Sequence, residues 1–426
     1  MRGFQRSELG VEVLRRCVDH GELVGIALRE RPLAAIVSAE LPWLDRELVG
    51  TLHDAGVTVV AVENVPGMRP LDRLGVAHLL DPGAGVESVA ALLARLAPER
   101  GPIHSEGATN GAAKAERALD ESGVLVRTAT GSGGSGSGAL LAVWGGAGSP
   151  GRTSVAAHLA IELGAQGARV ALIDGDCWAA SIAQLLGIAE SPSVTKAARL
   201  ASEGWPEALD SCLQHGPCGV RVMAGLPRAD LWPEVRERAW RAVLDEARSG
   251  SDVVVVDLAA SVEEDEELSF DRVPYRRNLM TRVALEEADQ VVFVVDANPI
   301  GLRRAIFAHR SLVEGMPRSI ERMVTLLNRA PSDAKRQEQL AGELARWCEL
   351  EPAGFLPAET AFGRVCWEGR LLHEIAPKSK WLRDLRGLVA DGVVLTGSPV
   401  ATGVAAGVAA EVAGGSIEAA EARFRI

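Results

Sequence analysis

The sequence predicts an α/β protein with two domains, each built on a mostly parallel sheet with helices on its faces. At 426 residues the chain exceeds one ordinary core, because domains usually hold about 100 to 200 residues. Apolar strands alternate with amphipathic helices on both sides of a Gly/Ser-rich stretch, which is the pattern of parallel sheets joined by helical crossovers. The composition, 47% hydrophobic and 24% charged, is that of a globular protein.

Two biased segments set the domain boundaries. The segment over 100–138 is poor in large apolar residues and ends in TATGSGGSGSG, which is typical of a flexible linker. A second stretch, TGSPVATGVAAGVAAEVAGG, opens a low-complexity tail over 396–426. We therefore expect a first domain over 1–99 and a second domain over 139–395.

Charge and cysteine usage narrow the classes of function. The formal net charge is −12 and no dense basic patch is visible, so a nonspecific grip on nucleic acid is not expected. The 6 cysteines include no Cys-x-x-Cys pair, which favours a reducing compartment. No apolar run is long enough to span a membrane, the amino terminus lacks a signal-peptide core, and the tail lacks a basic amphipathic helix. These features predict a cytoplasmic protein that reaches a membrane only through partners.

Strand and helix patterns alternate across the first domain. Leu44, Leu48 and Leu52 repeat at helical spacing after the apolar strand LAAIVSAE, and 86–96 has the pattern of a closing helix. Two further apolar runs, VTVVAV and GVAHLLDP, predict strands, and only LGVEVLRR is available for a strand at the beginning.

This outline resembles the receiver domains of response regulators, which have a flavodoxin-like fold. That family carries a phosphoacceptor Asp four residues before a Pro and a Lys before a later Pro, and Ser38 and Asp81 stand at these positions here. A serine lacks the carboxylate nucleophile, and an aspartate repels a phosphoryl group. The resemblance implies a pseudo-receiver that binds a partner or packs on the second domain, and an unrelated small α/β domain is the alternative.

A glycine-rich loop opens the second domain. The apolar strand ALLAVW precedes it, and Val155, Leu159 and Leu163 mark the face of a following helix. Strand, loop and helix are the context in which backbone N–H groups close around phosphates, and the pattern G-x-x-x-x-G-K-[ST] is met except for one residue. The predicted nucleotide-binding residues of this loop are Gly146, Ala147, Gly148, Ser149, Pro150, Gly151, Arg152, Thr153 and Ser154.

The exception is Arg152, which stands where the pattern has lysine. Arginine keeps the charge but brings a broad planar fork in place of a compact ammonium. We therefore expect nucleotide binding to persist while hydrolysis is slow or depends on a partner. A glycine-rich turn without a ligand is the alternative.

Acidic residues follow the later strands of this domain. The strand RVALIDGD ends in Asp174 and Asp176, and the four-valine strand SDVVVVDLAAS carries Asp257. Carboxylates at this edge of a parallel sheet can hold the water shell of Mg²⁺ or orient an attacking water. Two more apolar strands are predicted to close on Asp296 and Asn328.

Taken in chain order, these motifs resemble the MinD/ParA/Mrp branch of P-loop NTPases, and most closely the CpaE-like ATPases of Flp/Tad pilus assembly, in an actinobacterial form. The family's D-x-D is matched by Asp174 and Asp176, and its N-[KR] pair by Asn328 and Arg329. The segment GFLPAETAFGRVCWEGRLLHEIAPKSKW resembles the family's closing motif. A receiver-like domain ahead of the ATPase is a further CpaE-like feature.

The resemblance implies ATP and Mg²⁺ as cofactors and assigns a role to each site residue. Thr153 would bind the metal, with Asp174 and Asp257 in support, and Arg152 and Asp176 would be catalytic. Asn328 and Arg329 would contact the base. The implied enzyme is an ATP hydrolase, slowed by the departure at the loop arginine.

A second departure concerns dimerisation. The family's signature lysine reaches across a homodimer to the partner's phosphates, and Ala147 occupies its position here. Loss of that cation removes a direct electrostatic link between two sites. Arg276 and Arg277 lie in an insertion after the four-valine strand and could replace it; solvated surface charge is the alternative.

Three functions remain open at this level. The first is an ATPase that positions or assembles a cell-envelope machine, with protein partners in a pilus, a secretion system or a cell-pole complex. The second is a non-hydrolysing nucleotide sensor or scaffold. The third is a chromosome-partitioning, plasmid-partitioning or septum-site ATPase.

Overall fold

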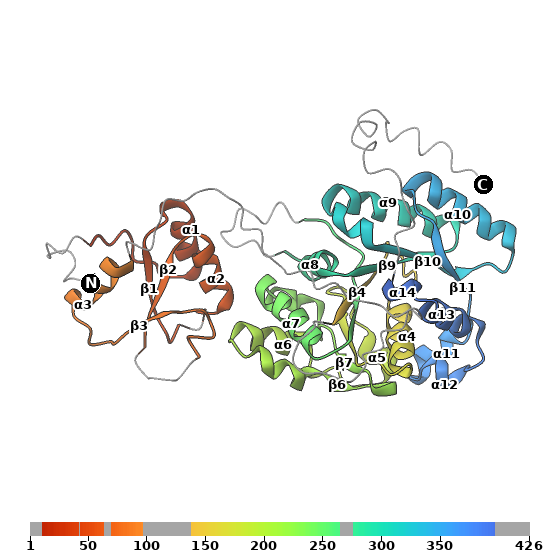
Figure 1. Cartoon of the computed structure of the whole chain (residues 1–426), viewed down its shortest axis with the longest axis horizontal. Helices are drawn as coiled ribbons and strands as arrows, with labels where there is room; N and C mark the ends of the chain where they lie inside the picture. Colours follow the sequence, from red (N-terminus) through yellow and green to blue (C-terminus); the bar gives the residue numbers. More distant parts are fainter. Residues whose placement is uncertain (1–10, 42, 64–69, 97–137, 265–275, 397–426) are drawn as a thin grey trace, which may run out of the picture.

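The computed structural model describes residues 11–41, 43–63, 70–96, 138–264 and 276–396. These residues form two separate sheets, one in each expected domain (Figure 1). The expected linker and tail lie outside the described residues, apart from Gly138 and Thr396 at their edges.

The first domain is a small parallel sheet packed against helices. Its strands lie in the order β1-β2-β3 and all pair in parallel. The buried Leu44, Leu48 and Leu52 join one core with α1, as the helical spacing predicts, and Val60 packs with α3 on the other face. The elements are α1 (His20–Glu30), β1 (Ala34–Ser38), α2 (Arg46–Asp54), β2 (Thr58–Val62), β3 (His78–Leu80) and α3 (Val86–Leu96).

The receiver-like assignment of this domain remains a prediction. Of the segment LGVEVLRR, the described residues 11–16 form no strand, so the described sheet has three strands. A flavodoxin-like sheet has the order 2-1-3-4-5, and three sequential parallel strands correspond to one half of it. Ser38 ends β1 and Asp81 follows β3, and each side chain accepts a hydrogen bond from a nearby backbone amide.

The second domain contains a sheet of eight strands in the order β11-β10-β9-β4-β8-β5-β7-β6. All neighbours pair in parallel except β6 and β7, so the expectation of a mostly parallel sheet is confirmed. Its strands are β4 (Ala139–Trp144), β5 (Val170–Gly175), β6 (Gln214–His215), β7 (Arg221–Met223), β8 (Val253–Leu258), β9 (Gln290–Asp296), β10 (Met323–Ala330) and β11 (Pro352–Pro357).

Helices cover both faces of this sheet, as the apolar strands require. One face packs against α6 to α10, and the other packs against α4, α5 and α11 to α14. The helices are α4 (Arg152–Ala165), α5 (Ile182–Leu186), α6 (Val194–Ser202), α7 (Glu237–Ser249), α8 (Leu279–Glu287), α9 (Pro299–Gly315), α10 (Ala334–Cys348), α11 (Phe362–Glu368), α12 (Leu372–Ile375), α13 (Lys380–Ala390) and α14 (Val393–Thr396). Short 3₁₀ helices span Pro206–Cys212, Pro217–Gly219, Ala229–Glu234 and Pro317–Arg322.

The two domains meet along α2 and α7. The guanidinium of Arg236 lies 2.6 Å from a carboxylate oxygen of Asp45, and the backbone N–H of Arg238 donates to Glu47 at 2.9 Å. The side chain of Arg238 also pairs with Asp54. Burial raises the pKa of Glu47. We call these contacts the interdomain seam, and its polarity is that of a surface interface.

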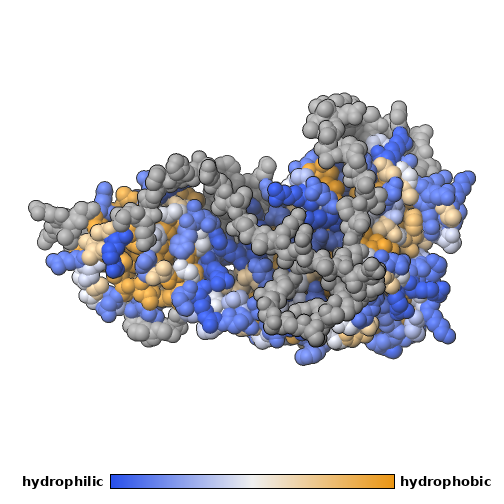
Figure 2. All heavy atoms as spheres, viewed as in Figure 1, coloured by the Kyte–Doolittle hydropathy of each residue, from blue (hydrophilic) through white to orange (hydrophobic). Residues whose placement is uncertain are grey.

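Hydrophobic residues are unevenly exposed. Figure 2 shows apolar residues gathered on one side of the first domain, whereas hydrophilic residues dominate the visible surface of the second. Leu28, Ile36 and Leu79 of the first domain are about half exposed, in keeping with a small sheet that its helices cover incompletely. Within the described ranges, no helix is both long and apolar enough to cross a membrane.

A buried imidazole anchors α4 to the closing helices. The Nδ1 of His158 donates to the carbonyl oxygen of Ser154 at 2.8 Å, and its Nε2 accepts from the backbone N–H of Leu372 at 3.2 Å. These two roles require the neutral ring. Burial lowers the pKa of His158 to about 4, and burial does the same for His309.

This burial predicts a loss of stability in acid. Below its ordinary pKa of 6.5 the imidazole of unfolded His158 takes a proton, whereas the folded one stays neutral down to about pH 4. The free energy of unfolding should therefore fall between these pH values, by about 3 kcal/mol from this residue. In urea unfolding at several pH values, His158→Gln should flatten the slope, and His215→Gln on the exposed surface should leave it unchanged. Equal slopes for parent and His158→Gln would contradict the assignment.

Candidate nucleotide-binding site

The loop between β4 and α4 has the backbone of an anion cradle. Gly148, Ser149 and Gly151 have φ angles of 93°, 57° and 100°. Such left-handed residues next to right-handed ones turn successive N–H groups toward one concave side. The crest of the loop, 147–149, is exposed, so the cradle is open to solvent.

The helix that follows leaves its first amides available. Gly151 precedes α4, and no side chain caps the helix. Uncapped N–H groups at the positive end of a helix of 14 residues attract anions. A Cβ on Gly151 would collide with the side-chain amide of Asn328, so only glycine fits there.

Arg152 braces this loop from within. Its Nη1 donates to the carbonyl oxygens of Gly145 and Gly146 at 3.1 and 2.9 Å, and its Nη2 lies 3.6 Å from a carboxylate oxygen of Asp176. Its Nε is buried and donates to none of the described residues. The Nη1 of the guanidinium thus holds the loop, whereas its buried Nε–H has no acceptor among the described residues.

Asp174 and Asp176 are both held by backbone amides. One oxygen of Asp174 accepts from the N–H groups of Ser181 and Ile182, at 2.8 and 2.9 Å, and the other accepts from Asp176 at 3.2 Å. Burial raises the pKa of Asp174 to about 6. Three of its acceptor sites thus serve the turn after β5 and the start of α5, and the predicted metal-binding role of Asp174 stays a prediction.

Asp176 differs in keeping one oxygen free for the site. Its Oδ1 accepts from the N–H groups of Trp178 and Ala179 at 2.8 and 2.9 Å, while its Oδ2 faces Arg152. The carboxylate is 6% exposed. An anchored carboxylate with one free oxygen can orient a water or steady the guanidinium.

Asp257 is the least compensated charge of the site. It is 1% exposed, and neither carboxylate oxygen accepts a conventional hydrogen bond from the described residues. It stands opposite Asp174 in the parallel pairing of β5 with β8. Burial and then the charge of Asp174 raise the pKa of Asp257 well above its usual range, and the hydroxyl of Thr153 and the charge of Arg152 oppose that rise. A bound cation would compensate the negative charge of this carboxylate.

The donor set fits magnesium that also binds a nucleotide. No cluster of three or more His, Cys, Asp or Glu side chains in the described part of the chain could hold a metal by itself. Mg²⁺ is commonly held by one or two protein oxygens, several waters and phosphate oxygens, so it needs no such cluster. Thr153 at the start of α4 and Asp257 beside it would provide the protein's share.

Asn328 is brought to the loop, but both of its polar groups are used by the chain. Its amide nitrogen donates to the carbonyl oxygen of Pro150 at 2.8 Å, and its amide oxygen accepts from the indole N–H of Trp381 at 2.9 Å. The residue is 4% exposed. Asn328 therefore positions the loop in this structure, and its predicted contact with a base is untested.

Arg329 and the insertion arginine Arg277 contact side chains outside the loop. Arg329 has a φ of 55° and forms a half-exposed ion pair with Asp296 at 3.3 Å. The guanidinium of Arg277 stacks on the indole of Trp178, 3.4 Å from the ring centre, and Arg276 is exposed. Stacking places Arg277 next to the Asp176 turn, so its predicted role stays untested and Arg276 gains no support.

Sequence reasoning missed two side chains that shape the loop. Trp381 comes from α13 and supports Asn328, and Arg304 comes from α9 and lies against Gly148. In the sequence, Arg304 is distinguished by its position one turn into the helix that follows β9. This position points to the loop only when β9 is known to pair with β4, the strand before the loop.

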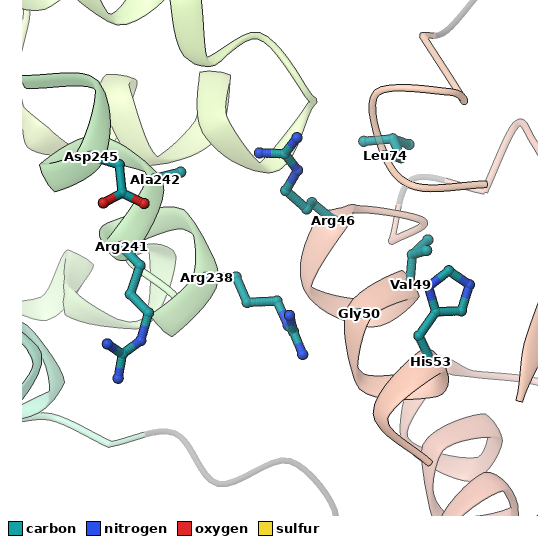
Figure 3. A pocket seen from close by; sticks show the side chains of 9 residues that line it. All are labelled: Arg46, Val49, Gly50, His53, Leu74, Arg238, Arg241, Ala242 and Asp245. Atoms are coloured by element: carbon teal, nitrogen blue, oxygen red, sulfur yellow. The ribbon is translucent and has the colours of Figure 1, made fainter. Parts of the chain in front are cut away.

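A separate cavity of about 360 Å³ lies at the interdomain seam (Figure 3). Three arginines line it, but Arg238 pairs with Asp54 and Arg241 with three glutamates. Arg46 donates to the backbone carbonyl oxygen of Arg73 at 3.1 Å. Because carboxylates already neutralise most of this charge, the cavity does not have the electrostatics of an anion site.

The strand, open loop, uncapped helix and buried carboxylates together have the arrangement of a P-loop NTPase domain. Residues 138–205 match the ParA family model, described as an NUBPL iron-transfer P-loop NTPase. The antiactivator FleN of Pseudomonas aeruginosa is 26% identical over 247 residues, which are 57% of this chain and 81% of that protein. These two matches support a place among the ParA/MinD-like P-loop NTPases.

Solved structures of similar proteins include a ParA family ATPase from Chlorobium tepidum TLS. It is 18% identical, with a TM-score of 0.49, over 58% of this chain and 97% of its own. Another is the septum site-determining protein MinD complexed with Mg-ADP from Pyrococcus horikoshii OT3. It is 17% identical, with a TM-score of 0.47, over 60% of this chain and 96% of its own.

The bridge from Pro150 through Asn328 to Trp381 is open to a direct test. Asn328→Ala should lower the free energy of unfolding by about 1–3 kcal/mol for each buried group left without a partner. Arg329→Ala, which removes a half-exposed ion pair, should lower it by about 1 kcal/mol or less. Urea unfolding followed by circular dichroism measures both. If Asn328→Ala is as stable as Arg329→Ala, the hydrogen bonds of Asn328 to Pro150 and Trp381 do not contribute to the stability of the fold.

Proposed function

We propose that the second domain binds a nucleoside triphosphate with Mg²⁺ at the loop from Gly146 to Ser154 and acts as a MinD/ParA-like ATPase. One observation carries this proposal. Two buried groups flank the same open loop: Arg152 Nε, which has no acceptor among the described residues, and the carboxylate of Asp257, to which none of them donates a conventional hydrogen bond. An anion and a cation together would satisfy both, and a magnesium-bound phosphate chain supplies both.

Each residue would then have a distinct task. The amides of the loop and of the first turn of α4 would bind phosphate oxygens, and Thr153 and Asp257 would hold the metal. When bound, Mg²⁺ supplies positive charge that offsets the charge of the phosphates. Asp176, fixed through one oxygen, would orient a water near Arg152. We propose ATP as the nucleotide on the strength of the sequence resemblance.

Slow hydrolysis follows from the way in which Arg152 is held. Two of its N–H groups bind carbonyl oxygens of the loop, so it cannot offer its whole fork to a phosphate without leaving them. The family's signature lysine is also replaced by Ala147. Both features favour a long-lived bound state, and the extreme case is a sensor that does not hydrolyse its nucleotide.

The cellular role is proposed from resemblance. The likeness to CpaE-like ATPases favours positioning or assembly of a cell-envelope machine, such as an Flp/Tad pilus or a secretion system, through protein partners. The likeness to FleN, an antiactivator, makes a regulatory contact with another protein a comparable role. Partitioning and septum-site functions fit the same family matches, and so does a homodimer.

The first test is binding. Titration calorimetry with ATP and Mg²⁺ should show one site per chain, and Arg152→Ala should bind about ten-fold to hundred-fold more weakly because a charge-assisted contact is lost. Arg364→Ala, which removes an exposed arginine of α11, is the matched control. A parent protein that stays unliganded at saturating ATP would end the proposal, and an Arg152→Ala protein of unchanged affinity would remove the arginine from it.

The second test is chemistry. Single-turnover hydrolysis of ATP should be slow but measurable, and Asp176→Asn should reduce the rate about 100-fold or more while binding persists, because the water loses its orienting carboxylate. Asp230→Asn, in the exposed 3₁₀ helix Ala229–Glu234, is the control. Binding without any turnover, with or without partner proteins, would favour the non-hydrolysing sensor instead.

A further inference from the structure

An arginine outside the loop lies directly against it. β9 pairs with β4, so the helix that follows β9 begins beside the loop that follows β4. The side chain of Asn298 caps this helix by accepting from the N–H of Gly301 at 2.9 Å, which fixes its first turn. Arg304 lies on the next turn of α9.

The contact with the loop is close and depends on two glycines. A Cβ on Gly146 would lie 2.9 Å from the carbonyl oxygen of Arg304, and a Cβ on Gly148 would lie 2.7 Å from its Cζ. Contacts below 3.0 Å essentially never occur for a real Cβ, so any other residue at either position would displace the helix or the guanidinium. The absence of a side chain at Gly148 is what lets the guanidinium rest on the loop.

The charge of Arg304 is not neutralised by the described part of the chain. The side chain is exposed, and no described residue forms an ion pair or hydrogen bond with it. Arg310 of the same helix, in contrast, pairs with Glu314 at 3.0 Å. A free guanidinium against an open ring of amides adds positive potential where an anion would bind.

We propose that Arg304 binds the outer phosphates of the nucleotide held by the loop, as a cation supplied by the same chain. This inference rests on the proposed function. The start of α4 would hold the inner phosphates, so the first half of the loop, where Gly148 lies, faces the outer ones. Ala147 brings no charge to this half, and Arg152 is engaged with carbonyl oxygens, so Arg304 supplies what the loop itself lacks.

A cation at this place discriminates between nucleotides. Its planar fork can bind two phosphate oxygens at once, and a triphosphate extends farther along the loop than a diphosphate does. Arg304 is thus a specificity-determining residue that favours the triphosphate.

The experiment compares ATP and ADP, each with Mg²⁺, by titration calorimetry on the full chain. In Arg304→Ala the affinity for ATP should fall about ten-fold to hundred-fold, and the affinity for ADP should fall clearly less. Arg304→Lys, which keeps the charge but not the fork, should recover part of the loss. Arg310→Ala removes the same charge from the same helix and should change neither affinity. Thermal unfolding of each variant confirms that it is folded.

Each other result overturns the inference in a recognisable way. If the parent binds ATP and Arg304→Ala binds it equally well, the arginine has no part in the site, although the proposed function stands. If Arg304→Ala loses the same factor of affinity for ATP and for ADP, the arginine does not bind the outer phosphates. If the parent binds neither nucleotide, the inference and the proposed function fail together.

Discussion

The parallel alignment of β4, β5 and β8 is the constraint on which the rest of this structure depends. Because their carboxyl ends share one edge, Asp174 and Asp257 face each other in the interior, next to the loop. Burial raises the pKa of both carboxyls, the charge of Asp174 raises that of Asp257 further, and the fold compensates the two groups unequally. Asp174 receives three amide hydrogen bonds, whereas Asp257 receives no conventional one from the described residues. That imbalance is typical of a functional site, because a purely structural core seldom contains a buried carboxylate without hydrogen-bond donors.

The cations of the site are distributed in an unusual way. Within the loop, Arg152 is the cation, and its Nη1 donates to two backbone carbonyl oxygens of the loop. Ala147, at the position of the family's lysine, carries no charge. Arg304, outside the loop, lies against Gly148, and none of the described residues pairs with its charge. Because this charge is carried by a capped helix of 17 residues, its position depends on the packing of α9 rather than on the loop. Preorganised charge of this kind needs little rearrangement when a ligand arrives.

Local patterns in the sequence predicted most elements, and long-range geometry could not be predicted. Four valines before Asp257 identified β8 because a strand buried on both faces must be apolar throughout, and Leu44, Leu48 and Leu52 identified α2 by their spacing. The sequence did not predict β11, because two prolines and a glycine weaken its pattern, as is common for an edge strand. The loop and its carboxylates were predictable as motifs. The engagement of Asn328 by Trp381 was not, because it depends on residues 53 positions apart in the chain.

The interdomain seam has a consequence for the evolution and handling of this chain. In these contacts Asp45, Glu47 and Asp54 of the first domain face Arg236 and Arg238 of the second. A neighbouring ion pair runs the other way, from Arg73 of the first domain to Glu207 of the second. Separating the domains would leave complementary charges on the two contact surfaces, which would attract each other more strongly in dilute buffer than in concentrated salt. A homologue that lacked the first domain would have little reason to keep these arginines. We therefore expect relatives that have the first domain to keep these two arginines, and relatives that lack it to have lost them.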